Sequence, residues 1–306
     1  DRQCGSSQQA IHFAAQAVMS GTQDVVVAGG VEAMSMVPIG ASVKDGFDAG
    51  HGFPFSAEGI AKRYPGVFFS QFTGAELVAE KWKLSRENLD AFALESHQKA
   101  KHATEMKYFD KEILPLAGRN EHNDNDMVFA DEGIRFDASL EALAGLNPVT
   151  EGGVITAGNA SQITDGAAAI MICNDEGLKK IKVDPRAKII ALSVVGDDPV
   201  FMLTGPIPAS HDVLARAKMS IDDMDIYEVN EAFAPVPLAW AIELGADKAK
   251  LNVNGGAMAL GHPLGATGAK LMTTMLHELE RREGKYALQA ICEGGGTANA
   301  TIIERI

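Results

Sequence analysis

Hydrophobic and polar positions follow two spacings along residues 185–306. RAKIIALSVVG (186–196) and DMDIYEV (223–229) have the apolar, β-branched composition typical of strands. EAFAPVPLAWAIELG (231–245) and GATGAKLMTTMLHELERR (265–282) predict helices. A short helix near 210–217, a strand at LNVNGG and two last strands, ALQAICE and TANATIIERI, complete the order βαβαβαββ. This order predicts an α/β fold with a mostly parallel sheet covered by helices.

The start of the chain resembles the end of this unit. Residues 4–21 have helical spacing, DVVVAGG (24–30) is a strand that ends in glycines, and DGAAAIMICN (165–174) is similar to the closing strand TANATIIERI. We therefore expect an internal duplication whose first half is interrupted by an insertion. The halves are unequal, because the C-terminal half has five expected strands and the first keeps one helix and two strands. A segment N-terminal to Asp1 is expected to be missing.

The insertion has a pattern of its own. FTGAELVAEKW (72–82) and residues 85–109 predict two amphipathic helices, and Ser85 is a suitable N-cap for the second. The expected organisation is a remnant of the first half at 1–34 and 162–180, an inserted loop domain at 35–161, and the C-terminal half at 181–306.

Composition narrows the function classes. The chain has 306 residues, 46% of them hydrophobic, and a formal net charge of −14. That charge argues against a nucleic-acid partner, and no apolar run is long enough to span a bilayer. The three cysteines give neither a disulfide framework nor a zinc pattern, so we expect free thiols, no metal, and a reducing, cytoplasmic setting.

Cys4 directly precedes the first predicted helix and is followed by Gly5. The free N–H groups and the dipole of a helix N-terminus favour a thiolate, so we expect a nucleophilic Cys4 with a lowered pKa. Gly5 would permit the tight turn. A lone cysteine is more often an inert core residue, but a glycine-rich helix start is an unusual place for core packing.

Three more polar residues stand at the ends of expected elements. His262 lies in a glycine-dense loop, and Cys292 ends a strand before a run of glycines that begins at Gly294. Successive glycines can aim backbone N–H groups into a site as an oxyanion hole. Asn230 follows a strand, where open α/β sheets place functional groups, although a helix cap fits there too. Taken singly, His262 and Cys292 would be structural residues, and Cys173, in an apolar strand, is expected in the core.

Four motifs together resemble those of the thiolase family. DRQCGSSQQA resembles its nucleophile segment, NEAFA its asparagine motif, GHPLGATG its histidine motif, and CEGGGTA its second-cysteine motif. Order and spacing agree from Asp1 to Ile306. The resemblance implies a five-layered αβαβα fold of duplicated halves, the first truncated here, with an inserted loop domain for CoA and substrate. It also implies a homodimer or homotetramer acting in fatty acid degradation.

The implied reaction is cleavage of a 3-oxoacyl-CoA by CoA to acetyl-CoA and a shortened acyl-CoA, or the reverse Claisen condensation. CoA is then a substrate, and no cofactor is expected. By resemblance, Cys4 carries the acyl group, His262 activates it, and Cys292 is the general acid and base, with a pKa expected within reach of neutrality. One oxyanion hole would use His262 and a water held by Asn230. The second would use the N–H groups of Cys4 and Gly294.

Substrate contacts are implied for Ser161 and Phe233. Phe72 and Thr73 stand where family members with small substrates have His-Met, which favours a longer or bulkier acyl group. Two alternatives remain open. One is a 3-oxoacyl synthase-like enzyme of the same superfamily, against which Cys292 argues. The other is an inactive, truncated thiolase-like scaffold that binds CoA.

Overall fold

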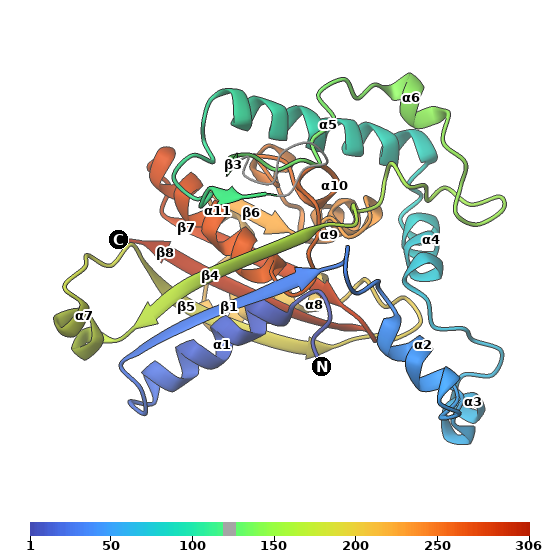
Figure 1. Ribbon diagram of the computed structural model, residues 1–306, viewed down its shortest axis with the longest axis horizontal. Coiled ribbons are helices and arrows are strands. Elements are labelled where there is room, and N and C mark those ends of the chain that lie inside the picture. The colour runs from blue at the N-terminus through green and yellow to red at the C-terminus, as the bar shows by residue number, and fades with distance from the viewer. Residues whose placement is uncertain (119–126) are drawn as a thin grey trace.

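The computed structural model describes residues 1–118 and 127–306 as layers of sheet and helix (Figure 1). The first half consists of α1 (Ser6–Met19), β1 (Val25–Ala33), β4 (Asp165–Cys173) and α7 (Asp175–Ile181). The insertion carries α2 (Ala41–Asp48), α3 (Glu58–Arg63), α4 (Gln71–Lys81), α5 (Arg86–Glu105), β2 (Leu116–Ala117), β3 (Met127–Val128) and α6 (Leu140–Ala144). The C-terminal half contains β5 (Ala187–Gly196), α8 (Pro206–Ala217), η1 (Ile221–Asp223), β6 (Ile226–Val229), α9 (Pro235–Leu244), η2 (Lys248–Lys250), α10 (Ala257–Leu260), α11 (Thr267–Arg281), β7 (Tyr286–Glu293) and β8 (Thr297–Arg305).

The C-terminal sheet has the strand order β5-β8-β7-β6. Only β6 and β7 pair in parallel, so the expectation of a mostly parallel sheet was wrong. The reason is local: the glycine turn after β7 is too short for a crossover and forces β8 to return antiparallel. The expected strand at LNVNGG forms only isolated parallel bridges in the described structure, between Leu251 and Tyr227 and between Val253 and Gly255. Four strands therefore stand where five were expected.

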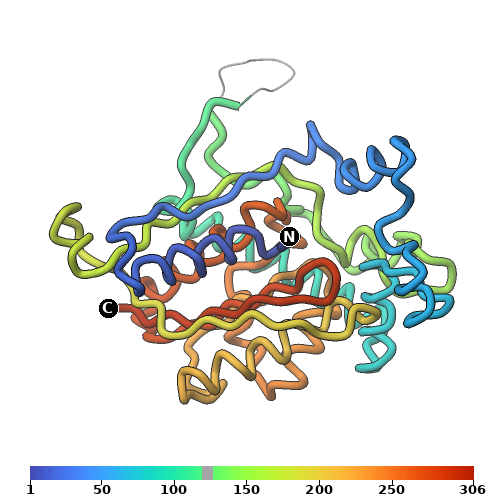
Figure 2. Tube along the Cα trace, turned by 90° about the horizontal axis from the view of Figure 1, so that it is seen from below, coloured from blue at the N-terminus to red at the C-terminus, as the bar shows by residue number. Residues whose placement is uncertain are grey.

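Two helices lie between the sheets. In Figure 2 the β1–β4 pair, the layer of α1 and α11, the C-terminal sheet, and α8 with α9 follow one another. Four of the five expected layers are thus present in the described residues. Side chains alternate along β1, and Val27 and Val31, on the face away from α1, are 69% and 71% exposed. That face of the β1–β4 pair is open.

Helix α1 faces the C-terminal sheet with polar as well as apolar residues. Gln8 donates to Thr301 Oγ1 and the His12 ring bonds the same oxygen, both at 2.8 Å. Asn299 donates to Gln9 at 3.2 Å. Buried polar groups need such partners, so this network fixes α1 and the residues just before it against β8.

The insertion confirms both helices expected for it. Ser85 accepts from the Asn88 N–H, and Asn88 accepts from the Ser85 N–H, which closes a capping box at the start of α5. Helix α5 then packs against α10, and α4 against α9. The insertion therefore covers α9 and α10 of the C-terminal half. Among the described residues, no helix has the length and apolarity needed to cross a membrane.

Candidate active site

Cys4 precedes α1 and is buried, with an exposure of 9%. It packs with Leu271 and Ile291, and Leu264 of the His262 loop lies against the same cluster. Cys4 itself adopts a left-handed backbone, with φ 76°, whereas Gly5 has φ −95°. Gly5 therefore does not supply the tight turn expected of it. Its lack of a side chain matters for another reason, because a Cβ there would lie 1.9 Å from Glu293 Oε1. The missing side chain makes room for a buried carboxylate.

The resting state of Cys4 also differs from expectation. Burial, followed by the charges of Cys292, Glu293 and Glu32, raises the pKa of the Cys4 thiol well above its usual value. Desolvation and three acidic neighbours outweigh the helix N-terminus here. Cys4 therefore rests as a thiol, and a base must take its proton before it attacks.

Cys292 lies at the end of β7, next to Glu293 and the turn of Gly294–Gly296. Burial first, then Glu293, raises the pKa of Cys292 to about 12. The expectation of a pKa near neutrality is not met, so Cys292 rests as a proton donor. The turn is fixed by the Asp197 N–H, which donates to Gly296 O at 2.7 Å. The Gly294 N–H points to Gln3 O, 3.4 Å away, beside Cys4.

His262 and Asn230 meet in the interior. The distance from His262 Nε2 to Asn230 Nδ2 is 3.2 Å, and both residues are buried. His262 Nδ1 lies 2.7 Å from Thr267 Oγ1, whose hydroxyl donates to Pro263 O at 2.8 Å. Because that hydroxyl has one proton, Nδ1–H must donate to it, which leaves Nε2 as the acceptor. Burial lowers the pKa of His262 to about 3, so the ring is a neutral base.

Asn230 has one free oxygen. Its Nδ2 donates to His262, while Oδ1 is buried without a hydrogen-bond partner in the described part of the chain. The neighbouring carboxylate of Glu231 accepts from Ser96, Asn252 and the Met258 N–H, and so ties β6, α5 and α10 together. Asn230 is therefore rigidly held, with an acceptor available for a water or ligand.

The two expected substrate contacts lie side by side. Ser161 N–H donates to Ala232 O at 3.0 Å, and Ala160 pairs with Phe233 in an isolated bridge. Phe233 stacks edge-on against Phe72, with ring centroids 5.4 Å apart. The structure thus brings Phe72 of the insertion next to Phe233 of the NEAFA segment.

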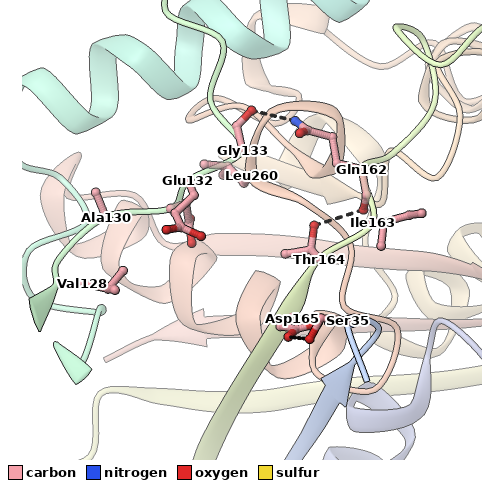
Figure 3. A pocket seen from close by; sticks show the side chains of 11 residues that line it. Ser35, Val128, Ala130, Glu132, Gly133, Gln162, Ile163, Thr164, Asp165 and Leu260 are labelled. Carbon is pink, nitrogen blue, oxygen red and sulfur yellow. Dashed lines mark hydrogen bonds between the residues drawn. The ribbon is translucent and has the colours of Figure 1, made fainter. Parts of the chain in front are cut away.

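A pocket of about 470 Å³ lies near this segment but holds none of the four catalytic candidates. Gln162 bridges to Gly133 O across it, and Asp165 accepts from Ser35 at its floor (Figure 3). Gln162 O also lies 3.4 Å from the His262 N–H. The pocket therefore flanks the site from the side of the insertion.

Several functional neighbours were missed from the sequence. Thr267 orients His262, Glu32 accepts from the Gly265 N–H at 3.0 Å, and Arg2 pairs with Glu293 at 3.2 Å. Sequence position could have indicated two of these neighbours, because Arg2 and Glu293 each stand within two residues of a motif cysteine. Nothing in local sequence distinguishes a buried Glu293 from an exposed turn residue.

Comparisons with known proteins agree along the whole chain. Residues 1–176 match the thiolase N-terminal domain and residues 183–305 the thiolase C-terminal domain. A steroid 3-ketoacyl-CoA thiolase of Mycobacterium tuberculosis is 53% identical over 100% of this chain and 74% of its own length. A 3-ketoacyl-CoA thiolase of Aliivibrio fischeri is 40% identical over 100% and 77%. Human mitochondrial 3-ketoacyl-CoA thiolase superimposes with a TM-score of 0.87 at 37% identity, covering 100% and 78%, and has also been solved with CoA.

Proposed function

Because this chain belongs to the thiolase family, we propose that Cys4 is the residue that carries the acyl group during the reaction. The enzyme is an acyltransferase that cleaves 3-oxoacyl-CoA with CoA to acetyl-CoA and a shortened acyl-CoA, or runs the reverse condensation. One observation carries the proposal: Cys4 is buried in a cluster with Leu271 and Ile291, against which Leu264 of the His262 loop packs, and the charge of nearby Cys292 helps to raise the pKa of the Cys4 thiol.

The geometry supports a role for each group in the first half-reaction. His262 Nε2, which accepts from Asn230 in the free site, is proposed to exchange that bond for the Cys4 proton, and the thiolate attacks the 3-oxo carbon of the substrate. The protonated ring, with a water held by Asn230 Oδ1, stabilises the developing charge. When the C2–C3 bond breaks, Cys292 donates its proton to the acetyl carbon. Acetyl-CoA leaves, and Cys4 keeps the shortened acyl group as a thioester.

The second half-reaction returns both protons. The Cys292 thiolate takes the proton of the incoming CoA thiol. The pKa of Cys292, about 12 in the free site, makes this thiolate a strong base. The CoA sulfur then attacks the thioester carbon, and the N–H groups of Cys4 and Gly294 are proposed to bind the oxyanion, for which the Gly294 N–H would exchange its bond to Gln3 O. Cys4 leaves as a thiolate and regains its proton from His262. Both cysteines are thereby thiols again, and CoA has been consumed as a substrate.

The acyl group is proposed to be medium-chain or ring-bearing. Phe72 packs on Phe233 beside the site, and the M. tuberculosis relative carries a steroid substrate in its name. Ser161, next to this pair, is proposed to contact the pantetheine part of CoA. A homodimer or homotetramer in the cytoplasm is proposed as well, with the residue ranges 1–34 with 162–180, 35–161 and 181–306 as structural units.

Acylation tests the central role. Incubation with a 3-oxoacyl-CoA followed by peptide mapping should find the acyl group on Cys4. Cys4→Ser should abolish labelling and turnover, because an alcohol near its usual pKa is a far poorer nucleophile than a thiolate. Cys173→Ser, at a cysteine outside the site, is the matched control and should retain both. Label on Cys292 in the unmodified protein would reverse the assignment of the two cysteines.

A further inference from the structure

A partly buried ion pair joins the two segments that carry the active-site cysteines. Arg2 Nη1 lies 3.2 Å from Glu293 Oε2, across 291 positions of the chain. Arg2 stands two residues before Cys4, and Glu293 directly follows Cys292. The Glu293 side chain is fully buried and that of Arg2 is 30% exposed. A carboxylate taken out of water at this place needs a cation beside it.

The surroundings of Glu293 leave it few other partners. Thr297 donates to Oε2 at 2.9 Å, and Oε1 has no hydrogen-bond partner within the residues that the structure describes. Oε1 instead faces Gly5, whose missing side chain leaves room for it. The carboxylate thus sits against the turn that aims Cys4, next to both thiols.

We propose that Arg2 and Glu293 form a positioning pair that clamps the Cys4 turn to the Cys292 strand and neutralises the carboxylate beside the two thiols. This inference rests on the proposed role of Cys4. An uncompensated Glu293 would repel a Cys4 thiolate, and Arg2 offsets that repulsion. Neither side chain touches the reacting atoms in this role.

Other charged and titratable groups face Cys4 as well. Cys292 and Glu293 come from the end of β7 and Glu32 from β1. His262, from the loop before α11, is neutral. Burial raises the pKa of Glu293 above its usual value, and the hydrogen bond from Thr297 and the charge of Arg2 oppose that rise. Glu32 is held separately by the Gly265 N–H, so the pair can be altered without touching it.

The test is the pH dependence of Cys4 alkylation by iodoacetamide, followed by peptide mapping so that Cys292 is scored apart. Glu293→Gln keeps shape and removes the charge, so Cys4 should react at least about threefold faster at pH 8, with a lower apparent pKa. Arg2→Gln leaves Glu293 uncompensated and should slow Cys4 by a similar factor. The double variant should return close to the original profile. Glu304→Gln, which removes the partner of Lys285 on β8, is the control and should leave the profile unchanged.

Opposite shifts separate this role from a purely structural one, since lost packing would change both single variants in the same direction. Equal profiles in folded Glu293→Gln and unmodified protein would overturn the proposal, whether or not Arg2→Gln folds. Acyl mapping is scored independently. If the acyl group were found elsewhere than Cys4, the proposed function would fail even where the alkylation shifts are seen.

Discussion

The side chains of Asn230 and His262 meet at 3.2 Å although 32 positions separate them in the chain. Asn230 directly follows β6, and His262 lies in the loop between α10 and α11. The contact fixes the direction of both groups: Asn230 donates with its amide nitrogen and keeps its oxygen free, and His262 receives at Nε2. This one hydrogen bond therefore fixes the orientation of both the His262 ring and the Asn230 oxygen.

Thr267→Val tests how this base is oriented. The valine is similar in shape but cannot accept from His262 Nδ1–H, which would be left buried without a partner. Such a loss costs about 1–3 kcal/mol, so kcat should fall roughly tenfold or more while the fold is kept. Thr273→Val, on the same helix and at a hydroxyl that donates to Ala269 O, is the matched control in steady-state assays. Equal kcat for the two variants would show that Thr267 does not orient the ring.

Gly5→Ala tests the space kept for Glu293. The added Cβ would lie 1.9 Å from Oε1, so the buried carboxylate or the Cys4 turn must move. Overpacking of this kind costs about 1–3 kcal/mol, which chemical denaturation measures. Gly46→Ala, on α2 and with nothing within 4 Å of the new Cβ, should cost nothing. A Gly5→Ala protein as stable as the Gly46→Ala protein would contradict the close approach.

Glu112→Gln tests a buried carboxyl under α11. Burial raises the pKa of Glu112 to about 7, with Thr274, Lys270, Asp131, Glu278 and His277 facing it. A raised pKa in the folded state means that stability is fully present below about pH 4.5 and is lost as pH rises through about 7.

The glutamine variant should not show this loss. Its stability relative to the original protein should improve by up to about 3 kcal/mol between pH 5 and pH 8, because one pKa unit corresponds to about 1.4 kcal/mol. Denaturant unfolding at both pH values measures the difference. Glu105→Gln, at the exposed end of α5, should leave the pH dependence as it was. A constant difference between Glu112→Gln and the original protein across this range would rule out a titrating Glu112.

Phe72→Ala tests the acyl pocket. In the unmodified enzyme, each added methylene should change kcat/KM by no more than about fourfold, because a buried methylene is worth about 0.8 kcal/mol. Removing the Phe72 ring, which packs on Phe233, should shift the preference toward bulkier 3-oxoacyl-CoA substrates. Phe13→Ala, at an exposed position on α1, is the control. A steep preference for acetoacetyl-CoA in the unmodified enzyme would show that Phe72 does not set the pocket.

Much of the fold could be predicted from local pattern. The α5 helix begins at the expected cap Ser85, and α4, α11 and β8 lie where periodicity indicated them. No full strand forms at LNVNGG, where the asparagine side chains bond to other elements: Asn252 donates to Glu231 and Asn254 to Glu278. Side-chain bonds replaced the ladder that the apolar pattern suggested.

The sequence by itself determined the four motifs, the family and the residue types available for chemistry, because these depend on short stretches of chain. Only the tertiary structure decided the state of those residues. It buried Cys4 and Cys292 among acidic groups, so both pKa values rise although a helix N-terminus favours the thiolate. It also placed Thr267 beside His262, and Arg2 beside Glu293. Desolvation and Coulomb interaction depend on distance in space, and residues far apart in sequence are brought together only by folding.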